Sequence, residues 1–546
     1  MNLKIRRTFK CVSTVVVAAM VPAFLLGACS GSSGNAIGTS STSPTSADAS
    51  VSKPTELSLW IPLTADFKGK NYNEKPSFQK MEKETNVHIN FEHVSDADVE
   101  NLFNLLMASG DLPDMIYYYN WDAQATKYGN SGALLPLEDL IREKAPNLER
   151  VLNENPEIRG QITSPEGHIY YIPNMALDST LLVQMFPQVR QDWLDKLGLE
   201  APKTTDDWYT VLKAFREKDA NGNGKADESP FVSIGLDSGM NGASGAAGLF
   251  APAFGIEFGF FVEDGKVKYG PYDPRFKDLM AFMHKLDAEN LLDTSPKDFA
   301  ALREKVLSGQ AGAWFGWAGS YMGTFTALMK EKDAATSFEV SPVLPPVGPN
   351  GDQRHTSHRW PASSFGIAVS SKTDKPEEII KWLDYQFSEE GVILNNFGVE
   401  GEGYTMQDGK PVYTDKIVKP ADGSPPSVAI LSQTIGGGAW PTITNVDGAL
   451  QMNAANGQAT SPTAQFASYI DLKKKLPPLQ FTKEETDIIA PIMADLSSFI
   501  KEASTNFVNG QLPLDNFDKY LKNVEKMKLS VVLEQYQKAY DRFIQQ

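Results

Sequence analysis

The chain has 546 residues, of which 41% are hydrophobic, and a formal net charge of −17. This length and composition suffice for two or more packed lobes and exclude a disordered protein. The acidic balance argues against general nucleic-acid binding, which needs clustered Lys and Arg side chains. The two cysteines, Cys11 and Cys29, both lie near the N-terminus. The body of the chain therefore has no disulfide framework, thiolate zinc cluster or cysteine nucleophile.

The first 28 residues are typical of a secretory signal peptide. Residues 1–10 are basic, and residues 11–26 form an apolar run that is too short to span a membrane. The sequence LGAC at 26–29 also matches the bacterial lipobox, in which cleavage leaves a diacylglycerylated cysteine. The alternative is an ordinary signal peptide with an incidental Cys29. We predict a lipid anchor at Cys29; cleavage before it leaves 47 basic and 68 acidic residues, a net charge of −21.

Residues 29–54 are predicted to form a flexible tether. Of the 25 residues from 30 to 54, nine are Ser, three are Thr and three are Gly, with no hydrophobic pattern. The folded body is expected to begin near Thr55. Together, the signal, the lipidated cysteine and the tether predict an extracytoplasmic protein that is anchored to the cell membrane.

Strands and helices alternate at the start of the body, which is typical of an α/β fold with a mainly parallel sheet. Strands are expected at 56–61, 87–93, 115–119 and 364–369, with a turn followed by a strand at 167–173 and a further strand running into a Pro-rich loop over 340–351. Helices are expected at 77–85, 100–109, 137–144, 147–153, 191–197, 206–218, 274–289, 299–307 and 376–387. The last third predicts long amphipathic helices at 484–503, 513–527 and 530–544.

Residues 219–228 (DANGNGKADE) have the pattern of a calcium-binding loop. Oxygen-bearing side chains recur at loop positions 1, 3, 5 and 9, and a Gly at position 6 permits the tight turn. The match to an EF-hand is incomplete, because Pro230 stands where the bidentate Glu would be. The alternative is a solvated Asn-Gly turn. We predict a structural calcium ion held by the side chains of Asp219, Asn221, Asn223, Asp227 and Glu228 and by the backbone carbonyl of Lys225.

Aromatic residues beside polar loops are the candidates for ligand binding. Sugars present apolar C–H faces that stack on aromatic rings, while their hydroxyl groups need polar partners. In open α/β sheets, ligands bind beyond the carboxyl ends of the strands. The predicted contacts are Trp60, Trp121, Trp317, Trp360, Trp440 and Arg359. For each of these Trp residues the alternative is core filling, which we expect for Trp193, Trp208 and Trp382 on their amphipathic helices.

Catalytic patterns are sparse. None of the six His residues forms a zinc signature, and there is no nucleophile elbow, phosphate-binding loop or dinucleotide-binding motif. Glu400 and Glu402 could form a carboxylate pair, but such a pair is defined by distance rather than by sequence. We therefore predict that the protein is not an enzyme.

Several segments together resemble the extracellular solute-binding proteins of bacterial ABC importers, and most of all the branch that binds alginate and other oligosaccharides. They are the lipobox, ASGDLPDMIYY at 108–118, RQDWLDKLGL at 190–199, the loop at 219–228, NNFGVEGEGYT at 395–405 and the C-terminal FVNGQLPLDNFDKYLKN. The resemblance implies two α/β lobes of the periplasmic-binding-protein type joined by a hinge, with each lobe discontinuous. It places residues 55–172 and 366–400 in the N-terminal lobe and residues 173–365 and 401–546, with the calcium loop, in the C-terminal lobe.

The function implied by this resemblance is capture of an oligosaccharide between the lobes and delivery to the transmembrane subunits of an ABC permease. The protein is expected to act as a monomer, and the family's sugar contacts vary too much to be transferred residue by residue. The alternatives are a binding protein for a peptide or another polar solute on the same fold, and an anchored polysaccharide-degrading enzyme.

Overall fold

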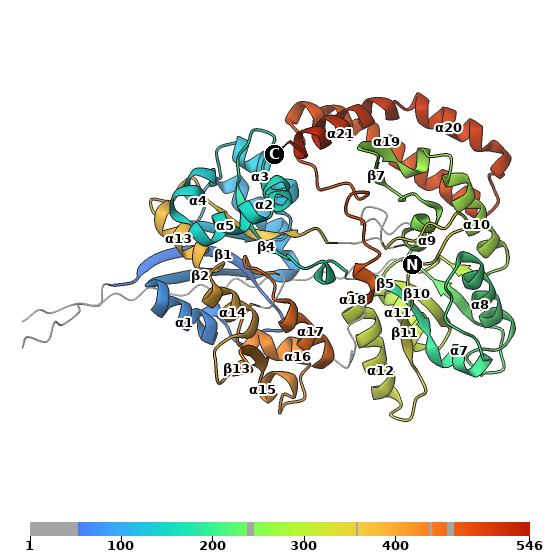
Figure 1. Cartoon of the computed structure of the whole chain (residues 1–546), viewed down its shortest axis with the longest axis horizontal. Coiled ribbons are helices and arrows are strands. Elements are labelled where there is room, and N and C mark those ends of the chain that lie inside the picture. Colours follow the sequence, from blue (N-terminus) through green and yellow to red (C-terminus); the bar gives the residue numbers. More distant parts are fainter. Residues whose placement is uncertain are drawn as a thin grey trace, which may run out of the picture. The chain divides into compact units, whose positions relative to one another are not determined.

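Figure 1 shows the computed structural model, which describes residues 53–183, 185–236, 245–355, 359–435, 439–455 and 463–545. The predicted signal peptide, Cys29 and the tether as far as Ser52 lie outside these residues. The first strand begins at Thr55, where the folded body was expected to start. Within the described residues, the helices are all too short or too polar to cross a bilayer.

The first sheet has five strands in the order β2-β1-β3-β12-β4. Its strands are β1 (Thr55–Leu63), β2 (Val87–Ser95), β3 (Met115–Tyr118), β4 (Tyr171–Met175) and β12 (Ala362–Val369). β1 runs parallel to β2 and β3, whereas β12 is antiparallel to both of its neighbours. A strand from late in the sequence therefore completes a sheet that begins at the N-terminus.

Helices cover both faces of the first sheet, as Figure 1 shows for α4 and α5 on one side and α1 on the other. The helices of this lobe are α1 (Pro76–Thr85), α2 (Val99–Ser109), α3 (Trp121–Asn130), α4 (Glu138–Lys144), α5 (Pro146–Glu154), α6 (Pro156–Ile162), α13 (Pro376–Tyr385) and α14 (Glu389–Phe397). Four of them begin with Pro, whose fixed φ suits the first helical turn. Together with the sheet they enclose one hydrophobic core.

The second sheet has the order β11-β5-β10-β6-β9. Its strands are β5 (Met185–Arg190), β6 (Ser229–Val232), β9 (Leu292–Asp293), β10 (Ala311–Trp317) and β11 (Val340–Pro342). Around it lie α7 (Gln191–Leu197), α8 (Thr205–Glu217), α9 (Ala246–Phe250), α10 (Phe276–Ala288), α11 (Phe299–Leu307), α12 (Thr324–Lys332) and the hairpin of β7 (Phe260–Glu263) and β8 (Lys266–Tyr269). This lobe has a separate hydrophobic core, which contains Trp193 and Trp208 as predicted.

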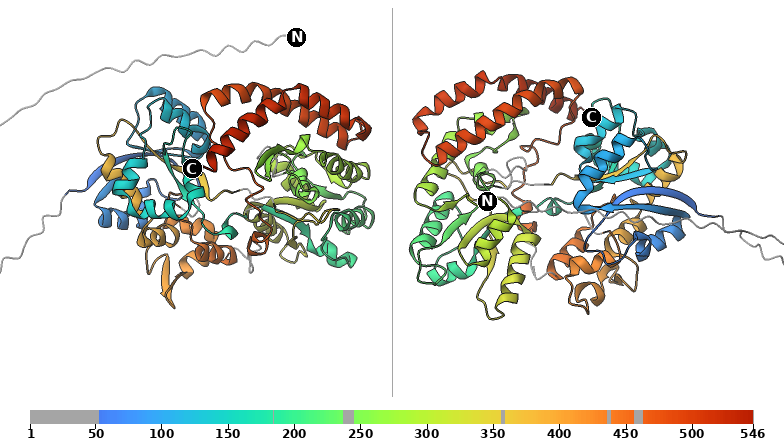
Figure 2. Two further views of the ribbon diagram at one scale, coloured as in Figure 1. Left: turned by 45° about the horizontal axis from the view of Figure 1, so that its top comes forward. Right: turned by 180° about the vertical axis from the view of Figure 1, so that it is seen from behind.

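Three long helices end the chain and belong to the second core. They are α19 (Lys483–Val508), α20 (Phe517–Lys526) and α21 (Leu529–Phe543), and they run side by side in both views of Figure 2. A capping box at Thr482 and Glu485 starts α19. Glu485 also pairs with Arg542 at the end of α21, at 2.8 Å. This ion pair links the start of α19 to the end of α21.

The chain passes between the two sheets three times. The first two connections join β4 to β5 and β11 to β12, close to the predicted positions near Ile172 and Gly366. The third follows α17 (Val446–Ala455) and leads to α18 (Thr463–Ala467), whose Phe466 packs on Phe186 of β5.

The predicted boundary near Glu400 is too early. Trp440 belongs to the first core, and the buried ammonium of Lys75 in that lobe donates to the backbone carbonyls of Leu431 and Thr434. The intervening segment forms a small satellite cluster of its own. It contains the hairpin of β13 (Tyr404–Gln407) and β14 (Lys410–Tyr413), and the short helices α15 (Asp415–Val418) and α16 (Pro426–Ala429).

Gly366 gives a test of how closely β12 is packed. A Cβ at this position would lie 2.5 Å from the carbonyl oxygen of Ile172 on β4. We expect Gly366→Ala to lower the free energy of unfolding by about 1–3 kcal/mol, because backbone on the neighbouring strand must move. Chemical denaturation measures this. Ser364→Ala on the same strand is the control, and equal stability of the two variants would contradict the packing argument.

Candidate functional site

Asn174, at the end of β4, ties the connecting segments to the first lobe. Its side chain is fully buried, and Nδ2 donates to the carbonyl oxygens of Trp440 at 2.9 Å and Thr442 at 3.2 Å. Its Oδ1 accepts from Thr444 Oγ1 at 2.9 Å and from the guanidinium of Arg359. Burial lowers the pKa of Arg359 to about 10. The structure therefore places this predicted contact residue where the chain returns to the first sheet.

Trp360, the neighbour of Arg359, lies beside an ammonium group. Its ring is partly exposed, and Lys475 Nζ lies 5.3 Å from the ring centroid. Lys475 stands on the segment between α18 and α19, where it forms an isolated antiparallel bridge with Phe261 of β7. Burial lowers the pKa of Lys475 to about 8, and the carboxylate of Glu257 opposes that shift. The Trp360 ring and the Lys475 ammonium, which are far apart in the sequence, thus lie next to each other.

Trp317 is the second candidate ring that remains partly exposed, at the carboxyl end of β10. Gln188 holds the strand end, because its Nε2 donates to the carbonyl oxygens of Gly316 at 2.9 Å and Trp317 at 3.1 Å. The other amide atom of Gln188 accepts from the fully buried Trp314. Trp314 is therefore part of the core, whereas Trp317 is partly exposed and packs against both the second core and the smaller cluster around Trp314.

The other three candidate Trp residues lie inside the first core. Trp60 is 5%, Trp121 0% and Trp440 2% exposed. Trp121 Nε1 donates to the carbonyl oxygen of Gly366 at 3.1 Å, and Trp440 Nε1 donates to Gln386 Oε1 at 3.1 Å. In this structure all three rings fill space, as the core-filling alternative describes, and those of Trp121 and Trp440 also satisfy their own N–H groups. Trp317 and Trp360 are the two candidate rings that remain partly exposed.

Sequence reasoning missed the polar groups beside Trp360 and Arg359. Lys475 and Asn174 lie in stretches without a motif, and their positions next to Trp360 and Arg359 depend on the tertiary fold. Asp122, next to Trp121, was also passed over: burial raises the pKa of its carboxyl group, and its backbone oxygen accepts from Gln480 Nε2 at 3.2 Å. The only local signal that could have identified Asn174 is its polar side chain near the end of an otherwise apolar strand.

In the loop 219–228, side-chain oxygens accept from backbone N–H groups: Asn223 donates to Asn221 Oδ1 at 3.0 Å, and Lys225 donates to Asn223 Oδ1 at 2.8 Å. Asp219 adopts φ 46°, and Gly222 and Gly224 both have φ 75°. Asp227 Oδ1 accepts from Asn221 Nδ2 at 2.9 Å and Asn223 Nδ2 at 3.0 Å. These two hydrogen bonds, the one from Asn223 first, hold the pKa of Asp227 below its usual value.

Glu228 supplies the test of whether a cation fits this loop. The residue is 3% exposed, and neither carboxylate oxygen has a hydrogen-bond partner. Such a carboxylate needs a cation or a donor. The described residues contain no cluster of three or more His, Cys, Asp or Glu that could hold a metal. The candidate ligands in the loop 219–228 differ from such a cluster, because they include two Asn side chains and a backbone carbonyl. Oxygen groups of this kind are the ligands that suit Ca²⁺. The residues present therefore fit a calcium ion.

Comparison with known proteins identifies the family. The sequence profile described as bacterial extracellular solute-binding protein matches residues 62–393. The chain belongs to this family. Among solute-binding proteins it is 32% identical, over 500 residues, to the fructooligosaccharide ABC transporter substrate-binding protein FusA of Streptococcus pneumoniae, covering 87% of this chain and 88% of FusA. It is 25% identical to the polygalacturonan/rhamnogalacturonan-binding protein YtcQ of Bacillus subtilis, over 62% of this chain and 66% of YtcQ.

Solved structures of solute-binding proteins have the same fold. FusA in complex with kestose aligns with a TM-score of 0.67 at 28% identity, covering 90% of this chain and 99% of FusA. The alginate-binding protein AlgQ2 aligns with a TM-score of 0.66 at 27% identity, covering 90% of this chain and 98% of AlgQ2. The predicted family and the predicted two-lobed α/β fold are both confirmed.

Proposed function

We propose that this solute-binding protein is the carbohydrate-binding subunit of an ABC importer and that its ligand is an oligosaccharide. The observation that carries the proposal is the match to FusA along most of both chains. The two partly exposed rings, Trp317 and Trp360, support it, because each lies next to polar groups that can serve sugar hydroxyls. The protein performs no chemistry in this proposal, and Glu400 and Glu402 are solvent-exposed.

The three connections between the sheets suggest how binding is coupled to delivery. A ligand held by Trp317 in one lobe and by Arg359, tied to Asn174 in the other, would favour a closed arrangement over an open one. It shifts that equilibrium only by its differential affinity for the two states. The closed form is then the one that the transmembrane subunits of the permease recognise.

The lipid anchor and the calcium ion belong to the same proposal. Cys29 would carry the lipid and hold the monomeric protein at the outer face of the cell membrane. Asp219, Asn221, Asn223, Asp227, Glu228 and the Lys225 carbonyl would hold the calcium ion. Bound there, the ion would neutralise the buried Glu228 and fix the loop next to α8. Solved structures of relatives are described as AlgQ2 without calcium ion and as a FusA EF-hand mutant, which supports an ion site in those proteins.

Oligosaccharide binding is tested by thermal shift and isothermal titration calorimetry. The panel contains neutral oligosaccharides such as kestose, acidic oligosaccharides, and peptides. A ligand at ~100 times its Kd should add about 2.7 kcal/mol to the native state and raise Tm. Trp317→Ala should weaken binding by about tenfold or more with Tm retained, whereas Tyr540→Ala on α21 serves as the aromatic control. Binding of peptides and of no carbohydrate would contradict the proposal.

The calcium ion is tested by chelation. Removal of calcium should lower Tm by about 2–4 °C or more, since the ion stabilises only the folded loop. Asp227→Ala should abolish the effect of calcium. Lys225→Ala should keep it, because that residue would contribute its carbonyl and not its side chain. An unchanged Tm after chelation would remove the calcium assignment.

The lipid anchor is tested with the two cysteines of the chain. We expect the wild type to partition into a detergent phase and to carry diacylglycerol on its N-terminal residue by mass spectrometry. Cys29→Ala should stay in the aqueous phase, and Cys11→Ala should behave as the wild type. Lipid on the Cys29→Ala variant would contradict the assignment.

A further inference from the structure

Besides the three chain connections, side-chain contacts join the C-terminal helices of the second lobe to the first lobe. Gln480, shortly before α19, makes such a contact with both polar atoms of its side-chain amide. Its Oε1 accepts from Thr126 Oγ1 at 3.0 Å, and its Nε2 donates to the Asp122 carbonyl oxygen at 3.2 Å. Asp122 and Thr126 are four positions apart in α3, so the amide spans one turn of that helix.

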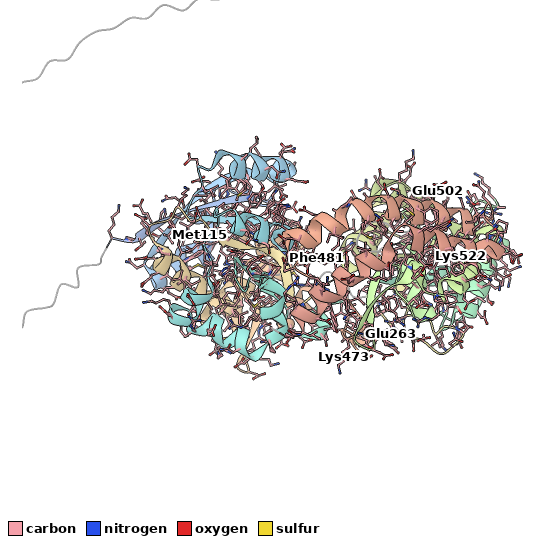
Figure 3. All side chains as sticks on the ribbon, turned by 90° about the horizontal axis from the view of Figure 1, so that it is seen from above. Met115, Glu263, Lys473, Phe481, Glu502 and Lys522 are labelled. Atoms are coloured by element: carbon pink, nitrogen blue, oxygen red, sulfur yellow. The ribbon has the colours of Figure 1, made fainter. Side chains whose placement is uncertain are left out.

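The second lobe fixes the position of Gln480. Its backbone carbonyl accepts from Arg542 Nη2 of α21 at 2.9 Å, and the same guanidinium donates to both carboxylate oxygens of Glu485 at 2.8 and 3.1 Å. The next residue, Phe481, packs on the second core and on Tyr536, with ring centroids 4.8 Å apart. Figure 3, which labels Phe481, shows this end of the helical layer beside the first lobe. The amide of Gln480 therefore moves with the second lobe.

The helix that Gln480 contacts is fixed in the first lobe. Trp121 and Ala125 are 0% and 5% exposed in the first core, and Trp121 Nε1 donates to the Gly366 carbonyl. α3 begins three positions after β3 ends, so its first turn lies at the carboxyl end of that strand. In open α/β sheets, ligands bind beyond this edge. The hydrogen bonds of Gln480 thus lie at the edge of the first lobe where a ligand is expected.

A second contact between the lobes lies close to the first. Phe543, the residue after Arg542, packs on Gly160 of α6, where a Cβ would lie 3.3 Å from the Phe543 ring. Gly160 is buried, and α6 is the helix that precedes β4. The start of α19 and the end of α21 thus contact two helices of the first lobe.

A link at the ligand-side edge can form only where the two lobes approach each other. It therefore stabilises arrangements in which one ligand can touch both lobes. Resting on the proposed function, we propose that Gln480 is a positioning residue that favours the closed, ligand-binding arrangement without touching the ligand. The apparent Kd is the intrinsic Kd divided by the population of the binding-competent arrangement. The link would therefore tighten binding of every ligand by the same factor.

Calorimetry on the full chain tests this role. The probes are kestose, raffinose and trigalacturonate. Gln480→Ala should weaken binding about three- to tenfold, which is the loss expected for one or two hydrogen bonds. The factor should be the same for each probe that the wild type binds, because the side chain acts on the lobe arrangement and not on the sugar.

Variants of the partner residue separate the link from a general effect of substitution. Thr126→Val removes the hydroxyl donor and should weaken binding, whereas Thr126→Ser keeps the donor and should bind as the wild type. Thr126→Val combined with Gln480→Ala should bind no more weakly than Gln480→Ala alone, because the two side chains act as a pair. Gln511→Ala removes an exposed glutamine of the same lobe and should leave the affinity unchanged. Tm of each variant shows that it is folded.

Pulsed electron paramagnetic resonance measures the lobe arrangement without a ligand. Nitroxide labels are attached to cysteines introduced at the exposed positions Asn104 of α2 and Lys522 of α20. The background carries Cys11→Ser and Cys29→Ser, which removes both native thiols. We expect Gln480→Ala to broaden the distribution of distances between the labels, because the lobes lose a link.

The outcomes separate the positioning role from the broader function. An unchanged affinity, a tighter affinity or an unchanged distance distribution in Gln480→Ala overturns the role of Gln480 and leaves the oligosaccharide function standing. If the wild type binds no carbohydrate, the proposed function itself fails, and the distance distribution still decides whether Gln480 holds the lobes together.

Discussion

The first lobe depends on one long-range strand insertion. β12 lies between β3 and β4, so the sheet that starts at Thr55 is closed by residues 362–369. Two contacts fix it there: the Gly366 carbonyl accepts from Trp121, and the Gly366 Cα leaves room for the Ile172 carbonyl. β4 and β12 each border one of the three connections between the sheets. Arg359 and Trp360 lie just before β12, so their position depends on the insertion of that strand. The candidate residues Arg359 and Trp360 are thus positioned by the core of the first lobe, although the sequence between β4 and β12 builds the second sheet.

Local patterns were sufficient for most helices and for the first strands. The expected strand at 87–93 and helix at 77–85 coincide with β2 and α1, because alternation and Pro76 are local signals. α14, a helix that the sequence analysis did not propose, has a weak apolar stripe, and its capping by Ser388 is visible only once the backbone is known. The third connection was misplaced because Trp440 is attached to the first core by Gln386, a contact across more than fifty positions.

The candidate site was harder to predict than the fold. A Trp beside a polar loop has the same local sequence whether its ring fills a core or meets a sugar, and Trp121 and Trp360 differ only in what tertiary packing places over them. The cation beside Trp360 is Lys475, which no sequence window contains together with that ring. The predicted calcium loop is the opposite case, because its residues lie within ten positions and turn geometry alone brings them together. Residues that are neighbours in the sequence can therefore be grouped from the sequence alone, whereas residues that only the tertiary fold brings together cannot.

The same strand insertion sets the order in which the protein can fold. A ribosome completes β3 at Tyr118 and begins β12 at Ala362. At about 5–20 residues per second, this interval lasts on the order of 10–50 s. Throughout it β4 has no partner in its sheet, and one edge of β3 remains unpaired. Exposed strand edges are sites of aggregation, and holdase chaperones act on such chains. The sheet of the N-terminal lobe therefore cannot be completed until two thirds of the chain has been made.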